Sequence, residues 1–169
     1  MNCRICQQIY RVLLSVVIFA VVSFAVITIP STPALALDFN NETLIGADFS
    51  GRDLKDASFT RANLRLCNFS NSDLQGVSFF SANLTDANFE GANLTNAGIG
   101  LARMKRVNLT NAILEGAFAY STKLEEAIID GADFTDVLLR DDVHERLCAV
   151  AKGRNPVTGR ETRETLLCD

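Results

Sequence analysis

The chain has 169 residues, of which 48% are hydrophobic and 21% charged, enough for one domain with a sizeable core. Its 20 acidic and 16 basic residues give a formal net charge of −4. A mildly acidic protein is poorly suited to hold nucleic acid through the phosphate groups, so we expect no nucleic-acid partner.

The first predicted element is a signal peptide, residues 1–36. Arg4 and Arg11 are its only charged residues, and an apolar run interrupted only by serines and a threonine extends over residues 12–29. Ala34-Leu35-Ala36 then has the small-x-small form that signal peptidase accepts. We predict cleavage after this tripeptide, so that the protein is exported and meets a membrane only through the segment that is removed. The alternative is an uncleaved anchor, because the run approaches the about 20 residues that span a bilayer.

Residues 37–141 form a predicted repeat domain with a period of five. Beginning at Phe39, every fifth residue is apolar, and we call it the centre of its unit. The residue two before each centre is small or short, with three exceptions in the first units, Leu37, Glu42 and Arg52. In an extended segment these two positions point to the same side, so both are expected to face inwards. Glycine, asparagine or aspartate fills the last position of many units and favours a turn there.

Turns of about a right angle after each unit would close a square of four units. Sorting the centres in steps of 20 supports this geometry, because it separates aromatic from aliphatic residues in the first coils. Two opposite columns begin with Phe39, Phe59, Phe79 and Phe49, Phe69, Phe89, and the two between them begin with Leu44, Leu64, Leu84 and Leu54, Leu74, Leu94. The pattern predicts a four-sided solenoid of about five coils, with inward side chains stacked about 4.8 Å apart.

The A(D/N)LXX pattern, as in ANLRL at residues 62–66 and ANLTN at residues 92–96, resembles that of the pentapeptide-repeat family. It holds in register for 105 residues without an insertion. The resemblance implies an all-β solenoid, a right-handed quadrilateral β-helix. The Asn, Asp and Ser residues just before the centres are expected to hydrogen-bond the nearby backbone rather than to bind a metal ion.

Residues 142–169 are predicted to form a two-helix C-terminal cap, because the open end of a repeat stack invites aggregation. We expect an amphipathic helix over residues 143–152, stopped by Gly153, and a second short helix over residues 161–167. The first helix would present Val143, Leu147 and Val150 on one face. The side chains expected to cover the ends of the columns are Leu147, Val150, Leu166 and Leu167.

The tail contains LC at residues 147–148, NPVTG at 155–159, TRE at 162–164 and LC at 167–168. This run resembles the tail of pentapeptide-repeat proteins of the thylakoid lumen in cyanobacteria and chloroplasts. The resemblance implies a lumenal location. The export signal by itself fits the periplasm equally well.

Three cysteines remain after the predicted processing. Cys67 occupies an inward small position and is expected to be a buried free thiol. Cys148 and Cys168 each lie on one of the two predicted cap helices, and in an exported protein we expect a disulfide between them. A zinc site or a redox role for this pair is the more specific functional alternative, but neither a CxxC motif nor a nearby histidine pair supports it. His144 is expected to be an exposed helix residue rather than a catalytic base.

A candidate partner surface comprises Phe80, Phe118 and Tyr120. Phe80 and Tyr120 fall in one outward column, and Phe118 adjoins it. Ala119 between Phe118 and Tyr120 is the one undersized centre, so a local bulge in which an aromatic ring partly fills the space is the competing interpretation and the one we favour. A basic cluster on the next side is expected to be a solvated face; its members are Arg103, Lys105 and Arg106.

The sequence contains no converging nucleophile, base and orienting group, no phosphate loop and no metal motif, so we predict that the protein is not an enzyme and has no cofactor. The leading hypothesis is an exported structural or protein-interaction module with an unassigned protein partner. One alternative is the DNA-mimic class of the same family, which binds DNA gyrase; the export signal and the basic cluster argue against it. The other is a lumenal redox-responsive protein that uses Cys148 and Cys168.

Overall fold

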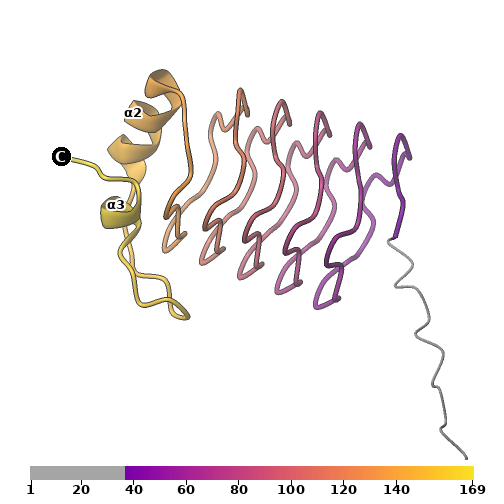
Figure 1. Ribbon diagram of the computed structural model, residues 1–169, viewed down its shortest axis with the longest axis horizontal. Helices are drawn as coiled ribbons and strands as arrows, with labels where there is room; N and C mark the ends of the chain where they lie inside the picture. The colour runs from indigo at the N-terminus through magenta and orange to yellow at the C-terminus, as the bar shows by residue number, and fades with distance from the viewer. Residues whose placement is uncertain (1–36) are drawn as a thin grey trace, which may run out of the picture. The chain divides into compact units, whose positions relative to one another are not determined.

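The computed structural model describes residues 37–169, and the predicted signal peptide lies outside this range (Figure 1). Parallel backbone bridges join residues 20 positions apart in an unbroken series, from Asp38 paired with Ser58 to Ile113 paired with Asp133. Each coil therefore has four sides, and we call the five-residue unit on one side a rung. Successive coils lie side by side along the stack, so the four-sided solenoid predicted from the step of 20 is confirmed (Figure 1).

Neighbouring rungs on one side of the solenoid share three backbone hydrogen bonds. In a representative pair, Phe59 N–H donates to Ser78 O at 2.7 Å, Arg61 N–H to Phe80 O at 2.9 Å, and Ser78 N–H to Ala57 O at 3.0 Å. The residue two after each centre turns the chain in the left-handed region, as the φ of 58° at Arg61 shows. Glycine, asparagine and aspartate reduce the strain of this conformation, which explains their frequency at the turns.

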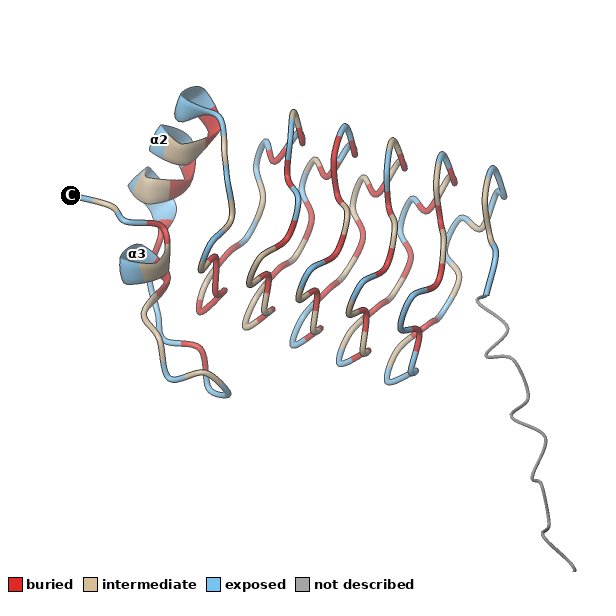
Figure 2. Cartoon of the chain, in the orientation of Figure 1, coloured by how far each residue is buried: buried red, intermediate tan, exposed pale blue. Residues whose placement is uncertain are grey.

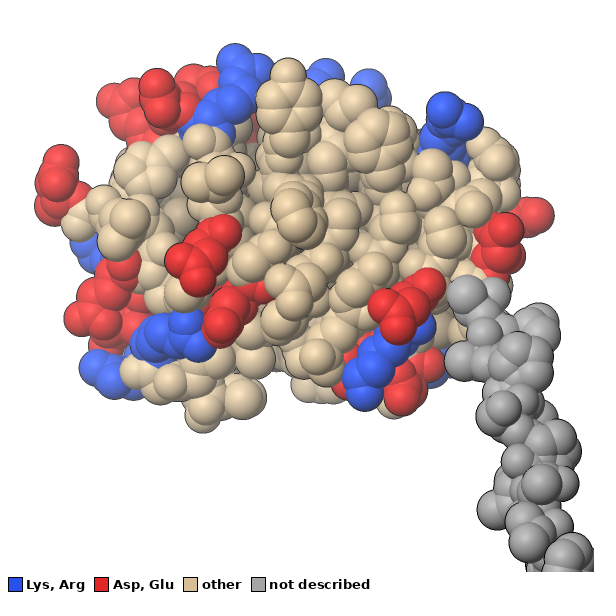
Figure 3. Space-filling model, in the orientation of Figure 1, with Lys and Arg blue, Asp and Glu red and all other residues tan. Residues whose placement is uncertain are grey.

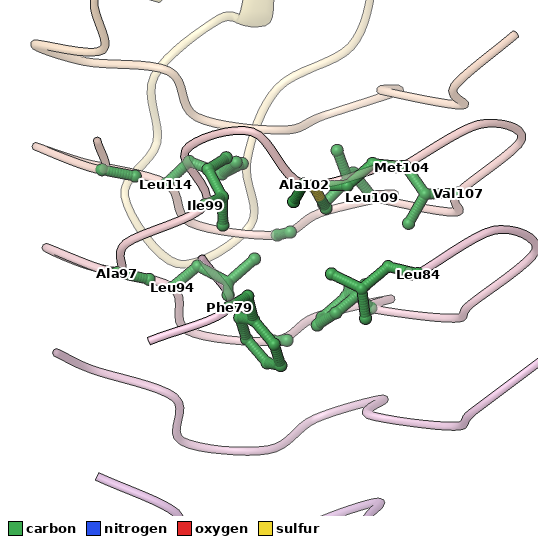
Figure 4. Close-up of a cluster of buried hydrophobic side chains, with 14 of the residues drawn as sticks. Phe79, Leu84, Leu94, Ala97, Ile99, Ala102, Met104, Val107, Leu109 and Leu114 are labelled. Atoms are coloured by element: carbon green, nitrogen blue, oxygen red, sulfur yellow. The ribbon is translucent and has the colours of Figure 1, made fainter. Parts of the chain in front are cut away.

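The phenylalanine columns form the core of the first coils. Phe59 lies over Phe79 with ring centroids 5.2 Å apart and planes 14° from parallel, and it meets Phe69 of the opposite column edge-on at 5.7 Å. Aliphatic side chains and Met104 continue the stack in the later coils (Figure 4), and buried positions recur along the inner side of each coil (Figure 2). Burial of each large side chain contributes about 1.5–3 kcal/mol.

Polar side chains hold the outer side of the rungs. Asn88 Nδ2 donates to Asn68 Oδ1 at 3.3 Å, and Asn108 Nδ2 donates to Asn88 Oδ1 at 3.0 Å, so one amide ladder crosses three coils. Asn108 Oδ1 also accepts the Thr110 N–H at 3.0 Å, and the equivalent bond recurs in other rungs. The structural role expected for these residues is confirmed.

Two helices follow the solenoid, α2 over Asp141–Val150 and α3 over Thr162–Thr165 (Figure 1). α2 has the predicted length of 10 residues but begins and ends two residues earlier, with both aspartates in its first turn where acidic groups favour a helix start. α3 is shorter than predicted. Within residues 37–169, no helix has the length and apolar character of a membrane span.

The predicted role of Gly153 as a helix stop is wrong, because the backbone is already extended at Ala151. Gly153 instead allows the chain to touch the last coil. Its φ is +83°, and a Cβ at this position would lie 2.9 Å from the backbone nitrogen of Gly131. Gly131 N–H donates to Lys152 O at 2.9 Å, which fixes this close approach.

The C-terminal side chains that are buried differ in part from the expected set. Val143, Leu147 and Leu166 are buried and belong to the same cluster as the solenoid core. Val150 and Leu167 are 52% and 83% exposed, so their predicted burial is wrong. Since α2 ends at Val150, the following Ala151 turns towards the core in its place and is buried; Leu167 lies in the turn that ends α3.

Candidate interaction surface

The three aromatic residues singled out in the sequence occupy one side of the solenoid. Phe118 and Tyr120 are 70% and 75% exposed, and Phe80 is 43% exposed. Phe80 is more covered because its ring lies against Gly100, where an added Cβ would be 3.5 Å from Phe80 Cδ2. All three side chains therefore contribute apolar surface, and the two rings of the later rung contribute most of it.

The bulge interpretation of Ala119 is wrong. Ala119 is buried in its column, while the rings on either side of it are largely exposed and fill no interior space. The physical reason is the register of the rung. Phe118 pairs with Gly98, as the corresponding residues of the earlier coils pair with one another, so the alternation of the extended rung directs the side chains of Phe118 and Tyr120 outwards.

The backbone edge beyond this rung has no partner. Among the described residues, Ala117 O, Ala119 N–H and Ser121 N–H make no hydrogen bond, although the equivalent groups of the preceding rung are all bonded. Residues 137–140, which would form the next rung, separate from this edge and lead into α2 (Figure 1). A cleft of about 280 Å³ lies between the two segments, with Leu138 and Arg140 on its far wall.

A second cavity, of about 610 Å³, is lined by residues 134–139, by residues of α2 and α3 and by the turn that follows α3. Its wall includes Phe134, Leu139 and Leu166, and its rim includes His144 and Arg160. Both rim groups already have protein partners, since His144 binds a backbone carbonyl and Arg160 binds two carboxylates.

The expected disulfide joins Cys148 on α2 to Cys168, with their Cα atoms 5.6 Å apart. His144 Nε2 lies 2.6 Å from Leu166 O and 3.6 Å from Cys148 Sγ. The expectation of an exposed His144 is therefore wrong: the ring is half-buried, and Nε2 carries the hydrogen that it donates to the carbonyl. His144 and Cys148 are four residues apart on one helix face, and this spacing was the signal available in the sequence.

These groups form the one cluster within residues 37–169 in which three side chains of metal-binding type converge, with ligand atoms of His144, Cys148 and Cys168 within 4.8 Å of one another. The sulfur atoms are bonded to each other in this structure, and only thiolates are effective metal ligands. The chemistry open to the cluster as it stands is thiol–disulfide exchange. Arg163 Nη1 donates to Cys148 O at 3.0 Å, which places a cationic group beside the pair.

Arg160 anchors the C-terminal segment to the solenoid. Its guanidinium forms ion pairs with Glu115 at 2.5 Å and with Asp133 at 3.1 Å, and Asp133 is fully buried. Burial alone would raise the pKa of Asp133, but hydrogen bonds from Thr135 and the Arg160 charge outweigh it and hold the pKa below its usual value. The sequence analysis missed this contact.

Asn155 is a second anchor of the C-terminal segment. It is fully buried, and its Nδ2 donates to Gly131 O at 2.9 Å and to Asn111 O at 3.1 Å. Its Oδ1 accepts the Val157 N–H at 2.9 Å. One asparagine therefore ties the loop after α2 to two coils of the solenoid.

The basic cluster is largely neutralised by neighbouring carboxylates. Arg106 binds both oxygens of Asp86, at 2.6 and 2.7 Å, and Lys105 pairs with Glu126 at 3.0 Å. The hydrogen bonds from Arg106 lower the pKa of Asp86. Basic and acidic side chains are also interspersed on the face drawn in Figure 3, around a broad uncharged area. This face is not a continuous acidic surface.

Cys67 is the buried free thiol that its inward position predicts. Its Sγ donates to Leu44 O at 2.9 Å, and burial raises the pKa of the thiol. A neutral thiol in this position packs like a small apolar side chain.

A family model described as "Pentapeptide repeats" matches residues 43–79, 72–98 and 102–141, with 8 copies of the repeat. A crystal structure of a pentapeptide repeat protein from the thylakoid lumen of Arabidopsis thaliana is 48% identical, with a TM-score of 0.76, over 78% of this chain and 91% of that chain.

A curated relative, the chloroplast thylakoid lumenal 15 kDa protein 1 of Arabidopsis thaliana, is 62% identical over 37 residues. This match spans 22% of the present chain and 16% of the relative's length. The likeness to this relative is therefore high but confined to a short segment.

Proposed function

Because the chain belongs to the pentapeptide-repeat family, we propose that it acts as a non-enzymatic protein-interaction module, with Phe80, Phe118 and Tyr120 as its partner surface. The thylakoid lumen is the compartment of both relatives described above, and this supports the expectation of an exported lumenal protein. The proposal also includes two features of the fold beyond its four-sided coil. These are right-handed winding, implied by the family resemblance, and a cap over residues 142–169, supported by the burial of Val143 and Leu147.

The observation that carries this proposal is the exposure of two neighbouring aromatic rings, Phe118 and Tyr120, at 70% and 75%. Neither ring contributes to the core, and exposed aromatic side chains are typical anchors of protein interfaces. The rung that bears them is fixed by hydrogen bonds to the preceding coil, so little backbone ordering would accompany binding.

A cross-linking pull-down from the native compartment, followed by identification of the captured proteins, tests the proposal. We expect a specific partner that is retained by the wild-type protein and lost at least tenfold with Phe80→Ser or Tyr120→Ser. Val157→Ser is the matched control, because Val157 is 78% exposed on the C-terminal segment and lies outside the proposed surface. Retention of the partner by both aromatic variants would reject the surface.

A second candidate function, redox response of the cap disulfide, is favoured by one observation. His144 Nε2 lies 3.6 Å from Cys148 Sγ, and its N–H, which is donated to Leu166 O, would be shared with the thiolate formed on reduction. In this exchange an external dithiol is oxidised to its disulfide while the Cys148–Cys168 bond is reduced to two thiols.

The midpoint potential separates the two roles of the disulfide. A structural bond is expected below about −300 mV, whereas a redox-active one is expected near the about −270 mV of thioredoxin. If the redox role holds, His144→Ala shifts the potential to a more negative value, because the thiolate loses its partner. A potential below about −300 mV that is unchanged in His144→Ala would reject it.

No observation favours the gyrase-binding alternative. A DNA mimic needs a dense acidic surface, and on the face of Figure 3 basic side chains interrupt the acidic ones. Two of the three basic residues of the cluster are also paired with acidic side chains.

A further inference from the structure

The side of the solenoid that carries Phe118 and Tyr120 ends in an open strand edge. Between the preceding rung and this one, Phe118 N–H donates to Ala97 O at 2.9 Å, and the Ile99 and Leu101 amides donate to this rung at 3.0 and 2.8 Å. At the next step the equivalent three groups are Ala117 O, Ala119 N–H and Ser121 N–H. Among the described residues none of the three has a hydrogen-bond partner.

The reason lies in the start of α2. Arg140 is the N-cap residue of α2, and its carbonyl accepts the Val143 and His144 amides at 3.0 and 2.9 Å. Burial of Val143 and Leu147 holds the helix in place, so the chain leaves the solenoid before it can pair as a further rung. Leu138 is consequently 87% exposed, and the cleft of about 280 Å³ separates it from the open edge.

We propose that this edge, residues 117–121, docks an extended segment of a partner protein as an added parallel strand. The acceptor and two donors are spaced as in every paired rung, and this arrangement fits the main chain of another extended segment. The inference deepens the proposed function and rests on it, because it assigns the partner's contacting segment a conformation and a chemistry.

The register of the rungs specifies the side chains of that segment. Its first residue would donate to Ala117 O and accept from Ala119 N–H, with its side chain outward over Phe118. Its third residue would accept from Ser121 N–H, with its side chain over Tyr120. The second side chain would point inwards over Ala119, where the column carries phenylalanine or isoleucine in the preceding coils and is here undersized.

The expected occupant is therefore a run of three apolar residues in extended conformation, with aromatic or β-branched residues at the first and third positions. Asp136 and Arg140 both line the cleft, so the wall offers one charge of each sign and no net preference for a charged segment. The competing occupant is the chain's own residues 138–140, which would have to leave their present position to pair with the edge.

The test is NMR-detected hydrogen exchange and peptide titration on the protein without its predicted signal peptide. This form keeps residues 37–169 and the buried cluster that they contain. In the free protein we expect fast exchange of the Ala119 and Ser121 amides and slow exchange of the Ile99 amide. The probe is the synthetic peptide acetyl-Ser-Phe-Val-Tyr-Ser-amide. Its addition should shift and protect the Ala119 and Ser121 amides.

Two changes isolate the backbone contacts. N-methylation of the peptide's Phe nitrogen removes the donor to Ala117 O and should weaken binding at least tenfold. Ala119→Pro removes an N–H that is unbonded in the free protein, so it should leave the fold intact and weaken binding similarly. Val157→Ser is the matched control, since Val157 is exposed on the C-terminal segment and does not line the cleft, and it should leave peptide affinity within twofold.

Slow exchange of the Ala119 and Ser121 amides in the free protein would show that the edge is not open. Absence of peptide-induced shifts, or equal binding of the N-methylated peptide, would overturn strand addition even if Ala119→Pro proves unstable. A native partner that is lost with Tyr120→Ser but kept with Ala119→Pro would refute strand addition and leave the interaction function standing. Peptide binding without any surface-dependent native partner would support the edge and refute the proposed function.

Discussion

The ring of Phe59 lies over the ring of Phe79, with centroids 5.2 Å apart and planes 14° from parallel. The two residues are one coil apart, so their contact joins successive layers of the solenoid. Phe80, the next residue after Phe79, points outwards from the same rung and is 43% exposed. Of these two adjacent phenylalanines, Phe79 belongs to the core and Phe80 to the surface. The effect of truncating each ring on stability measures this difference.

Truncation of the inner ring should be far more destabilising than truncation of the outer one. Phe79→Ala removes a fully buried ring from a stacked column and is expected to lower the free energy of unfolding by about 3–5 kcal/mol. Phe80→Ala is the matched control and should cost about 1 kcal/mol or less. Urea unfolding with an unchanged m-value measures both, and equal losses would contradict the assignment of the two rings.

The ion pair between Asp133 and Arg160 should make stability depend on acid pH. Because the folded-state pKa of Asp133 is lowered, its contribution is present above the unfolded value of about 3.9 and is lost as pH falls through the folded value. Asp133→Asn should therefore show a smaller loss of urea midpoint between pH 6 and pH 3 than the wild type. Arg160→Gln should reduce the same pH dependence, and an unaltered dependence in both variants would exclude this pair as its source.

Gly153 should be the least replaceable glycine of the C-terminal segment. Gly153→Ala combines a left-handed φ of +83° with a Cβ placed 2.9 Å from Gly131 N, so it should weaken the contact between this segment and the last coil. Gly159→Ala is the matched control, since its φ is +71° and no atom lies within 4 Å of the added Cβ. The control should cost about 1–2 kcal/mol from backbone strain. Thermal unfolding compares the two, and a smaller loss at Gly153 would contradict the close approach.

The disulfide should stabilise the C-terminal segment more than the rest of the chain. Cys148 and Cys168 are 20 residues apart, and closure of a loop of this size is expected to contribute about 3 kcal/mol. Cys148→Ser should lower the free energy of unfolding by about that amount. It should also increase amide hydrogen exchange in α2 before exchange increases in the rungs that carry the phenylalanine columns. Uniform exchange along the whole chain would show instead that the bond supports the solenoid globally.

The sequence predicted the solenoid well because its signal is local and repeated. One rule, an apolar centre every five residues, determines the four-sided coil, the stacking of Phe59 on Phe79 and the turns at positions such as Arg61. The undersized Ala119 and the exposed rings beside it were also visible, although their interpretation as a bulge was wrong.

The C-terminal contacts were predicted less well because they join residues far apart in the chain and follow no repeat. Arg160 binds Glu115 across 45 positions, and Asn155 binds Asn111 across 44, so neither contact has a local pattern. The position of His144 beside Cys148 was accessible from helical spacing, but its bond to Leu166 O depends on how α2 and α3 pack.

The step of 20 between bridged residues also determines how such a chain can change its length. Insertion of twenty residues in repeat register would lengthen the stack by one full layer and keep every downstream side chain over its former neighbour. Insertion of a single five-residue unit would instead rotate everything downstream by about a quarter turn around the long axis. The number of units that precede Phe118 and Tyr120 therefore determines the side of the solenoid on which they lie relative to the first coils.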